Sequence, residues 1–448
     1  MRRWFVQVCL RLITLFGMGW PLAYLYRYAI VEVTSLADIV NNRPKILFLN
    51  PTRYRGDIEA IAGTGRFRVF TMSQSWMGRT FGSFYPRHKY GPLDFLMADP
   101  SAQIAHARRN HRALLRTFWP ALLRMQKIKL VIGAGYHYAQ DRDYGFVTFE
   151  SGIPFVLIHR ESFKASPAHR ADVLSRTAKF EPFKGTKILC HNRLLGDLIV
   201  QSGFVKTQQI AITGSIRVDN FVAKLAKVKP ERNVPQVTLF SFFHRAGLNQ
   251  SDPKFTNQFA GMWSVDGSAG FVQLFDEVHA TIAELAVARS DVKFVVKTKW
   301  GGRWNDKIFT AIAKVGLDAS TIPNLIITDQ GDPADLIMAS SAVVTFQSTT
   351  LAEALLGGCR VIYPYFAEVR RPEYRDWLLL YEDRDLFDLA TSKPELKQAI
   401  SVALANPKKD KSTLPRRRAV FEKYVSEVCG GVLDNYIKEF NFLIDADI

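Results

Sequence analysis

The segment between residues 342 and 364 constrains the fold of this chain more than any other. It holds two apolar runs, Ala342–Phe346 and Val361–Tyr363, separated by a hydroxyl-rich turn, a stretch with helical spacing and the pair Gly357-Gly358. A continuous apolar run is typical of a strand that is covered on both faces, as in a parallel sheet. The segment therefore predicts a strand, a helix and a second parallel strand, which is the repeating unit of an α/β fold.

Polar side chains follow the first of these strands, and a carboxylate lies about one turn inside the helix. These residues are Gln347, Ser348, Thr349, Thr350 and Glu353. Hydroxyl groups in this position cap a helix, and its free backbone N–H groups favour an anion such as phosphate. A carboxylate can accept hydrogen bonds from a ribose, as in other doubly wound nucleotide sites. Simple caps and a solvated glutamate are the alternative interpretation.

Apolar strand patterns alternate with helical spacing along most of the chain. In the first half, the predicted strands are 45–49, 67–71, 128–132, 155–158, 187–190 and 209–212. After a polar stretch at 228–235, the pattern restarts with strands at 237–240, 292–296, 325–328, 342–346 and 361–363. Strands separated by helices indicate βαβ units and parallel sheets. We therefore expect two Rossmann-like doubly wound domains that face a cleft.

Four stretches resemble, in the same order, segments of glycosyltransferases with the GT-B fold. They are Ile210–Asp219, which is similar to a V-T-G-x-x-R-x-D pattern, Phe294–Lys299, Gly331–Ile337 and the Ser/Thr motif described above. Within that fold, the chain resembles bacterial surface-polysaccharide transferases, including capsule-type Kdo and sialic acid transferases and the glycerophosphotransferases of teichoic acid synthesis. These families often carry K-x-H-P where this chain has Lys297-Thr298-Lys299-Trp300. If a histidine normally holds the donor phosphate, a lysine must do so here.

The resemblance covers the second half of the chain well and the first half loosely. It implies an acceptor domain at 31–228, a nucleotide-donor domain at 236–415 and a C-terminal helix, 416–448, that crosses back to the first domain. The implied activity is transfer of a sugar or polyol phosphate from a nucleotide-activated donor to a surface-polysaccharide or lipid-linked acceptor.

Ligands of doubly wound sheets bind at the carboxyl ends of the strands, and this rule selects further donor-site candidates. They are Ser241, His244, Arg245, Lys297, Lys299 and Arg303. Positive groups near a helix N-terminus stabilise the charge that develops on a phosphate leaving group. Any one of these lysines, taken alone, is more often a solvated surface charge than a ligand-binding group.

The same rule selects acceptor-side residues in the first half. An inverting transfer needs a base that deprotonates the acceptor hydroxyl. Glu161 is the first candidate, Asp57 the second and His137 the third. An ion pair of Glu161 with Arg160 or another neighbour is the alternative. Further acceptor-side candidates are Arg55, His159 and Arg160.

A metal site is not predicted. Asp141-Arg142-Asp143 has the spacing of a two-carboxylate site, but it falls in a stretch that the sequence predicts as a polar loop. We therefore expect lysines and a helix dipole to stabilise the leaving group, with no metal and no cofactor besides the donor substrate.

The charge of the chain indicates anionic partners. It has 448 residues and a formal net charge of +17, but no zinc-finger, RRM or homeodomain motif, so nucleic acid is not an expected partner. Its four scattered cysteines suit a reducing cytosol. Residues 1–30 contain arginines and aromatic residues but no acidic residue. This pattern predicts an interfacial helix on the inner face of the cytoplasmic membrane, with packing on the protein's own core or a single membrane span as alternatives.

Two other functions remain open at this point. A non-hydrolysing sugar-nucleotide epimerase shares the double fold, and the missing His-Pro also fits a non-catalytic relative that binds glycan or membrane. The sequence does not specify the base of the nucleotide, the sugar, the acceptor or the stereochemical outcome.

Overall fold

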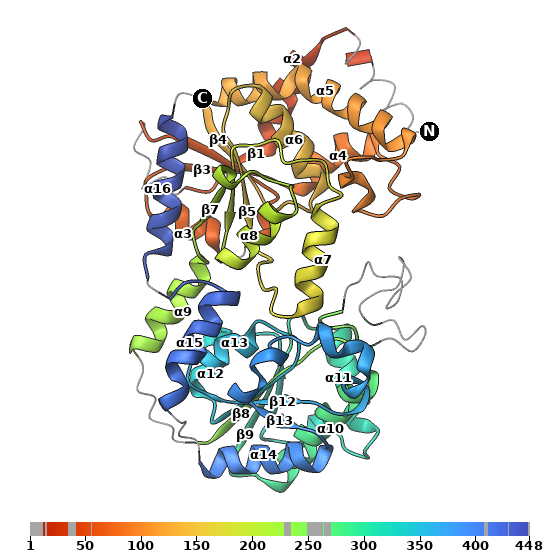
Figure 1. The fold of residues 1–448 in the computed structure, drawn as a ribbon, viewed down its shortest axis with the longest axis vertical. Helices are drawn as coiled ribbons and strands as arrows, with labels where there is room; N and C mark the ends of the chain where they lie inside the picture. The colour runs from red at the N-terminus through yellow and green to blue at the C-terminus, as the bar shows by residue number, and fades with distance from the viewer. Residues whose placement is uncertain are drawn as a thin grey trace. The chain divides into compact units, whose positions relative to one another are not determined.

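The computed structural model describes residues 12–13, 16–34, 42–54, 56–227, 234–248, 263, 270–406, 411–428 and 430–446. The chain divides into two compact units (Figure 1). The first unit consists of Met1–Ser162, Asp172–Asn220 and Cys429–Ile448, and the second of Phe163–Ala171 and Phe221–Val428. Each unit is described here by itself.

The first unit is built on a mostly parallel sheet that runs, within the described residues, in the order β1-β3-β2-β4-β5-β6-β7. Its strands are β1 (Ile30–Glu32), β2 (Lys45–Leu49), β3 (Arg68–Met72), β4 (Ile128–Gly133), β5 (Phe155–His159), β6 (Lys187–Cys190) and β7 (Ile210–Ile212). Only β1 pairs antiparallel among these strands, and it does so with β3.

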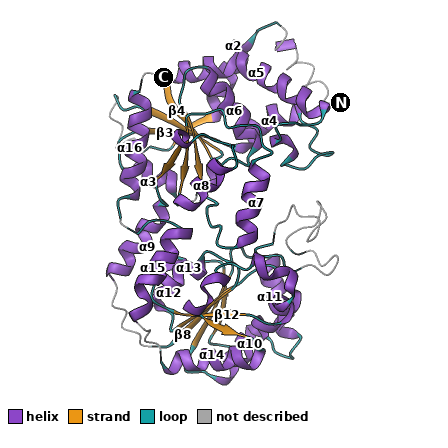
Figure 2. Ribbon diagram, viewed as in Figure 1, coloured by secondary structure: helices purple, strands orange, loops and turns teal. Residues whose placement is uncertain are grey.

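Helices cover both faces of this sheet (Figure 2). Along β2, Ile46 and Phe48 face one apolar cluster, whereas Leu47 and Leu49 face another. This alternation follows from the two-residue period of a strand. The helices of the unit are α2 (Gly19–Tyr26), α3 (Asp57–Gly63), α4 (Gln74–Phe84), α5 (Ala102–Gln126), α6 (Ala139–Glu150), α8 (Arg193–Gln201) and α16 (Val432–Asp445).

The second unit holds a parallel sheet whose described strands lie in the order β10-β9-β8-β11-β12-β13. They are β8 (Gln236–Phe240), β9 (Lys293–Lys297), β10 (Leu325–Thr328), β11 (Ala342–Thr345), β12 (Arg360–Pro364) and β13 (Asp388–Ala390). Its helices are α10 (Val272–Ala288), α11 (Arg303–Ala313), α12 (Pro333–Ala339), α13 (Thr350–Leu356), α14 (Lys393–Ala405) and α15 (Leu414–Tyr424). The division between the units passes through α7 (Pro167–Thr177) and α9 (Ile216–Lys227).

The two sheets confirm the predicted α/β class with Rossmann-like units, and every strand predicted from an apolar run is present within one or two residues. The sequence missed the short strands β1 and β13. It also predicted one helix for 416–448, whereas two helices lie there. The first of these, α15, belongs to the second unit, and α16 belongs to the first unit. Most of the predicted linker, 228–233, lies outside the described residues.

The N-terminal segment packs partly on the protein's own core. A Cβ atom on Gly19 would lie 1.8 Å from the carbonyl oxygen of Thr117, so α2 approaches α5 closely, backbone against backbone. Leu22, Ala23 and Tyr26 of α2 are buried. Residues 1–11 of the predicted interfacial helix lie outside the described part of the chain. No helix in that part is long and apolar enough to cross a membrane.

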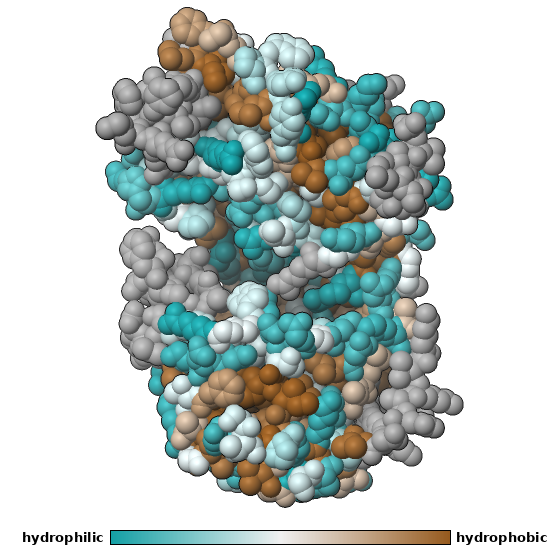
Figure 3. Space-filling model, turned by 180° about the vertical axis from the view of Figure 1, so that it is seen from behind, coloured by the Kyte–Doolittle hydropathy of each residue, from teal (hydrophilic) through white to brown (hydrophobic). Residues whose placement is uncertain are grey.

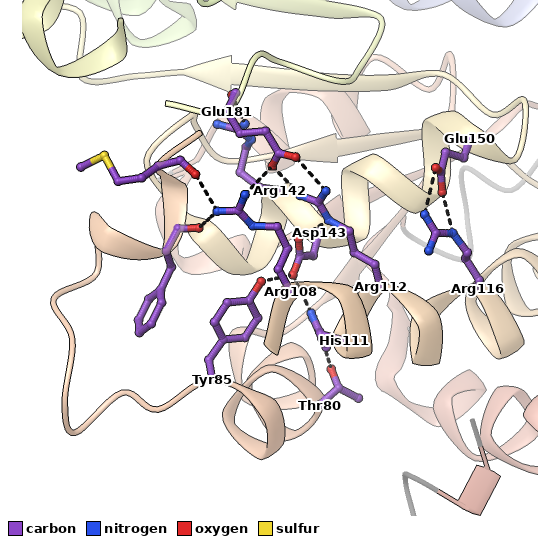
Figure 4. A network of polar contacts seen from close by, with 12 residues as sticks. Thr80, Tyr85, Arg108, His111, Arg112, Arg116, Arg142, Asp143, Glu150 and Glu181 are labelled. Carbon is purple, nitrogen blue, oxygen red and sulfur yellow. Dashed lines mark hydrogen bonds and ion pairs between the residues drawn. The ribbon is translucent and has the colours of Figure 1, made fainter. Parts of the chain in front are cut away.

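A buried polar network joins α5 and α6, and it corrects the prediction of a polar loop at 141–143 (Figure 4). Asp141 and Asp143 are buried residues of α6. Asp143 accepts hydrogen bonds from Arg112 Nε at 2.7 Å and from Tyr85 at 2.6 Å, and its carboxylate lies 2.8 Å from His111 Nδ1. Arg112 also contacts Glu181 through both terminal nitrogens, at 2.9 and 2.6 Å.

Burial alone would raise the pKa of Asp143, but Arg112, His111 and Tyr85 hold this pKa well below its usual range. Asp143→Asn removes the charged acceptor of Arg112, His111 and Tyr85, while Glu181 still pairs with Arg112, so we expect a loss of about 1.5–3 kcal/mol in the free energy of unfolding at pH 7. Because the pKa is lowered in the folded state, the contribution is present above the unfolded pKa of about 4 and is lost as pH falls below it. Urea unfolding of both proteins at a series of pH values measures this difference.

Glu150→Gln is the matched control, because Glu150 pairs with Arg116 on the surface of the same two helices (Figure 4). An exposed pair of this kind contributes about 0–1 kcal/mol. Equal losses in the two variants would contradict a structural role for the buried network.

Candidate functional site

Each sheet has one topological switch point, where the strand order reverses. In the second unit it lies between β8 and β11, because β9 and β10 extend the sheet on one side and β12 and β13 on the other. In the first unit it lies between β2 and β4. Open parallel sheets bind ligands in the crevice at the carboxyl ends of the strands beside a switch point. The candidate site therefore has two parts, one in each unit. Each part consists of the carboxyl ends of the strands beside the switch point with the loops that follow them, and it is called the edge of that sheet below.

The Ser/Thr motif lies at the second unit's switch point, directly after β11. Ser348 Oγ accepts a hydrogen bond from the backbone N–H of Thr350 at 3.3 Å, and Thr350 Oγ1 lies 2.9 Å from Thr345 Oγ1. Ser348 and Thr349 remain half-buried at the edge. Glu353 is buried within α13, so the solvated glutamate considered from the sequence is wrong.

Several predicted donor residues form the wall of this edge. Ser241 Oγ accepts a hydrogen bond from Trp304 Nε1 at 2.8 Å and lies 2.8 Å from His279 Nε2. Gln347 has a left-handed φ of 51° and binds the backbone at two points: its Nε2 donates to the carbonyl of Trp377, and its Oε1 accepts from the N–H of Leu379. These contacts fix the loops that surround the Ser/Thr motif.

His244 and Arg245, which follow β8, are also buried. Burial lowers the pKa of His244 to about 4, so its imidazole is neutral at pH 7. The side chains of His244 and Arg245 therefore support the strand ends from inside the fold and are not exposed to solvent there.

Three further cationic candidates lie at the end of β9, directly after it and at the start of α11. Lys297 Nζ donates to the carbonyl oxygens of Thr298 at 2.8 Å and Asp329 at 2.7 Å, and burial lowers its pKa. Lys299 Nζ lies 4.6 Å above the ring centre of Trp300. Arg303 is the first residue of α11 and is exposed. The carbonyl partners of Lys297 are neutral, so its charge stays at this edge.

In the first unit, Asp57 begins α3 and contacts Arg160, which follows β5. Arg160 Nε lies 3.1 Å from Asp57 Oδ2, and an Arg160 terminal nitrogen donates to the carbonyl of Arg53. Arg55, another predicted residue, lies outside the described part of the chain. The loops that follow β2 and β5 are thus joined through a guanidinium group.

The other predicted acid–base residues form a second group at this edge. His137 Nε2 lies 3.3 Å from Glu161 Oε2, and the Tyr138 hydroxyl donates to Glu161 Oε1 at 3.1 Å. The ring of buried His159 lies 5.2 Å from that of His137. The guanidinium of Arg53 lies 4.8 Å above the ring centre of Tyr138 and so connects this group to the Asp57–Arg160 pair. The structure therefore brings Glu161, Asp57 and His137 to one edge.

Their environments differ in a way that bears on acid–base chemistry. Burial raises the pKa of Asp57 to about 6, against the opposing effects of Arg160 and Arg217. The side chain of Glu161 is 62% exposed, so it can reach a molecule in solvent. Asp57 is thus a buried group that titrates near neutrality, and Glu161 is an accessible one.

Sequence reasoning missed Tyr138 and His191 at the same edge, and it placed Asp141 in a polar loop. Tyr138 binds Glu161, as described above. His191 directly follows β6, and burial with the nearby Arg160 and Arg217 lowers its pKa to about 3. Asp141 Oδ2 accepts from the N–H of Ala134 at 2.8 Å, and burial raises its pKa to about 7. The strand-end rule applied to β6 would have found His191, but the other two depend on side-chain positions.

No group of three or more histidine, cysteine, aspartate or glutamate side chains that could hold a metal ion occurs among the described residues. The absence of a predicted metal site remains a prediction, to be tested by activity.

Comparison with known proteins gives likenesses of architecture only. No family model matches the chain, and no curated protein matches it in sequence. Solved structures that resemble it include UDP-GlcNAc 2-epimerase from Neisseria meningitidis bound to UDP-GlcNAc, with 11% identity, coverage of 89% of this chain and 100% of that chain, and a TM-score of 0.46. A glycosyltransferase from Rickettsia africae has 11% identity, coverage of 90% and 99%, and a TM-score of 0.47. UDP-GlcNAc 2-epimerase from Methanocaldococcus jannaschii has 10% identity, coverage of 89% and 99%, and a TM-score of 0.44.

The raised pKa of Asp57 predicts a pH-dependent gain in stability for Asp57→Asn. At pH 8 the folded wild-type protein carries a buried charge there, whereas asparagine keeps a neutral partner for Arg160. A folded-state pKa of about 6 against the ordinary aspartate value of 3.8 corresponds to roughly 3 kcal/mol at about 1.4 kcal/mol per pKa unit. Asp57 loses this penalty as it binds a proton, so the advantage of the variant should shrink as pH falls from about 7 to 4.

Thermal unfolding of wild type and Asp57→Asn across this pH range tests the prediction. Asp172→Asn is the control, because Asp172 forms a partly exposed pair with Arg176 within one helix. A variant that is less stable than wild type at pH 8 would show that the pair with Arg160 outweighs the burial of the charge.

Proposed function

We propose that this protein is a glycosyltransferase that moves a sugar or polyol phosphate from a nucleotide-activated donor to a surface-polysaccharide or lipid-linked acceptor, with cationic side chains in place of a metal. One observation carries the proposal: the predicted donor residues and the predicted acid–base residues each lie at the switch-point edge of a Rossmann-like sheet. Such edges are where doubly wound sheets bind nucleotides and their substrates.

The second unit's edge suits the donor. Ser348 and Thr349 offer hydroxyl groups at the end of β11, and Lys297 offers a positive charge two strands away. Together they bind the phosphate groups, and the charge on Lys297 stabilises the leaving group as the bond to the transferred group breaks. Glu353 accepts hydrogen bonds from the ribose, or it orients the hydroxyl groups of the Ser/Thr motif from its buried position in α13.

The first unit's edge suits activation of an acceptor hydroxyl. Glu161 is accessible and lies beside His137, so this pair can accept the hydroxyl proton as the new bond forms. Asp57 holds Arg160 in place and is the second candidate for the base. A lipid-linked acceptor would bring the protein to the anionic inner face of the cytoplasmic membrane, which the net charge of +17 favours.

The donor assignment predicts that Ser348→Ala and Glu353→Ala each weaken nucleotide binding. Loss of a hydrogen bond to a charged partner should cost about 1.5–3 kcal/mol, or roughly tenfold to a hundredfold in affinity. A thermal-shift panel of CMP, CDP, UDP, GDP and ADP identifies the nucleotide, and calorimetry with that nucleotide measures the variants.

Ser401→Ala and Glu373→Ala are matched controls, because both side chains are exposed in the same unit and lie outside the motif. Unchanged affinity in both motif variants, with the fold intact, would remove the donor assignment.

The acceptor assignment predicts that Glu161→Gln lowers turnover by about 10²–10⁴, the usual contribution of general acid–base catalysis, with little change in nucleotide affinity. His137→Gln should lower turnover less if the imidazole only supports the carboxylate. Product formation from the identified donor, assayed with and without chelator, measures both effects. Asp57→Asn tested in the same way decides whether the second candidate is the base.

The same assay separates the other two functions. Conversion of the donor sugar to its epimer without any acceptor would identify an epimerase. Tight nucleotide binding with no turnover of any donor would identify a non-catalytic relative. Activity only with added divalent metal would contradict charge stabilisation by lysine.

A further inference from the structure

An exposed aromatic ridge, defined here as Trp20, Tyr24 and Tyr28, lies on the outer side of α2 and of the short 3-10 turn that follows it. These side chains are 68%, 53% and 63% exposed, and Leu25 between them is 52% exposed. Arg27 lies within the ridge, with its guanidinium 4.0 Å above the ring centre of Tyr24 and 4.7 Å above that of Tyr28. Aromatic rings interleaved with arginine suit the boundary between lipid headgroups and acyl chains.

The helix that carries the ridge is packed against the rest of the first unit through contacts with α4 and α5. On the inner side of α2, Tyr26 packs against Phe118 of α5 with ring centres 4.9 Å apart. Its hydroxyl donates to the carbonyl of Trp76 in α4 at 3.2 Å. Gly19 allows the close approach of α2 to α5 described above. The exposed aromatic side chains therefore stand on a rigid base.

A basic pocket, defined by Gly78, Arg79, Gly82, Ser83, Arg87 and His88, lies on α4 and the loop that follows it, and has a volume of about 560 Å³. Gly78 and Gly82 stand one turn apart and leave room for the Arg87 side chain, whose guanidinium lies 4.9 Å above the ring centre of Phe81. Arg79 lies 3.9 Å above Trp76, which itself packs on Tyr26 of α2. The pocket and the ridge are thus joined through two aromatic side chains.

The helices around these features carry no acidic residue. There is none in α2, α4 or α5, and none in the sequence between Glu59 and Asp94 or between Asp99 and Asp141. Arg109 and Arg124 of α5 are exposed, whereas exposed Arg116 is paired with Glu150 of α6. Figure 3 shows hydrophobic side chains gathered at the end of the first unit that carries α2. A face with apolar rings and positive charge fits an anionic lipid surface.

We propose that the aromatic ridge of α2 and the basic pocket of α4 form one docking surface for a bilayer of anionic phospholipids. The ridge enters the interfacial layer, and the pocket takes the phosphate of a lipid headgroup. Arginine forms bidentate contacts with phosphate, and the glycine pair of α4 lets the Arg87 side chain lie close along the helix, where Arg79 is the second cationic group of the pocket. The inference rests on the proposed function only in that a lipid-linked acceptor requires a membrane.

Vesicle binding of the full-length protein, without donor or acceptor, tests this surface independently of catalysis. The vesicles contain phosphatidylcholine alone or with about 30% phosphatidylglycerol, and bound protein is measured by co-sedimentation at low and high salt. Wild type should bind the anionic vesicles at least about tenfold more tightly than the neutral ones, and high salt should weaken this binding.

Two sets of substitutions separate the parts of the surface. Trp20→Ser with Tyr24→Ser and Tyr28→Ser should lower partitioning by about tenfold or more on anionic vesicles, because the inserted apolar area is lost. Arg79→Glu with Arg87→Glu should abolish the preference for anionic vesicles. The matched controls lie elsewhere on the chain and should bind as wild type does. They are Phe442→Ser with Val287→Ser and Ile326→Ser for the ridge, and Lys293→Glu with Lys423→Glu for the pocket.

Wild-type binding by both sets of variants, or equal loss in variants and controls, would overturn the proposal. So would a wild-type protein that ignores vesicles and dimerises through the ridge, seen by sedimentation velocity as a dimer that the ridge substitutions abolish. Binding of inorganic phosphate that calorimetry detects, that Arg79→Glu and Arg87→Glu abolish, and that leaves vesicle binding unchanged at equal ionic strength would show that the pocket binds a free phosphate instead of a headgroup.

Discussion

Burial of both faces of each parallel sheet is the constraint on which this structure depends. Along β2 the side chains alternate between two apolar clusters, so no position within the strand is free for a polar functional group. Functional side chains are thereby confined to the strand ends. In the first unit, α16 from the end of the chain helps α3 to cover one face of the sheet. Asp219 accepts hydrogen bonds from the first N–H groups of α16, those of Val432 at 2.6 Å and Leu433 at 3.3 Å.

The same constraint explains how much of the fold the sequence predicted. A strand covered on both faces needs a continuous apolar run, which is visible without any knowledge of its neighbours. The strands β1 and β13 are only three residues long and half-buried, so no such run marks them. The stretch at 141–143 is predicted as a polar loop because aspartate and arginine are usually solvated. Its helical, buried state depends on Arg112 and His111, about thirty residues earlier in the chain.

The candidate site was predictable to the level of position, but not of contact. The strand-end rule found Ser348, Asp57 and Glu161 because it needs only the ends of the strands. It gave no indication that Ser241 binds Trp304 and His279, or that Gln347 holds the loop at 377–379, since these partners lie 30 to 63 residues away. A polar residue after a strand can therefore support the edge instead of facing the ligand.

Positive and negative side chains are distributed unevenly over the first unit, and this distribution follows from the way in which α5 is buried. Arg108 and Arg112 on its inner side are paired by Glu181, with Asp143 as a further partner of Arg112. Those carboxylates come from α6 and from the segment before β6, so α5 needs none of its own, and its outward arginines add to the positive charge near α2 and α4. The carboxylates of Asp57 and Glu161 lie instead at the strand ends. At the strand ends, Asp57 and Glu161 are accompanied by Arg53, Arg160 and Arg217, so the positive charge there is partly neutralised. An anionic surface therefore attracts the region around α2 and α4 more strongly, and its field would orient this unit with that region toward the lipid.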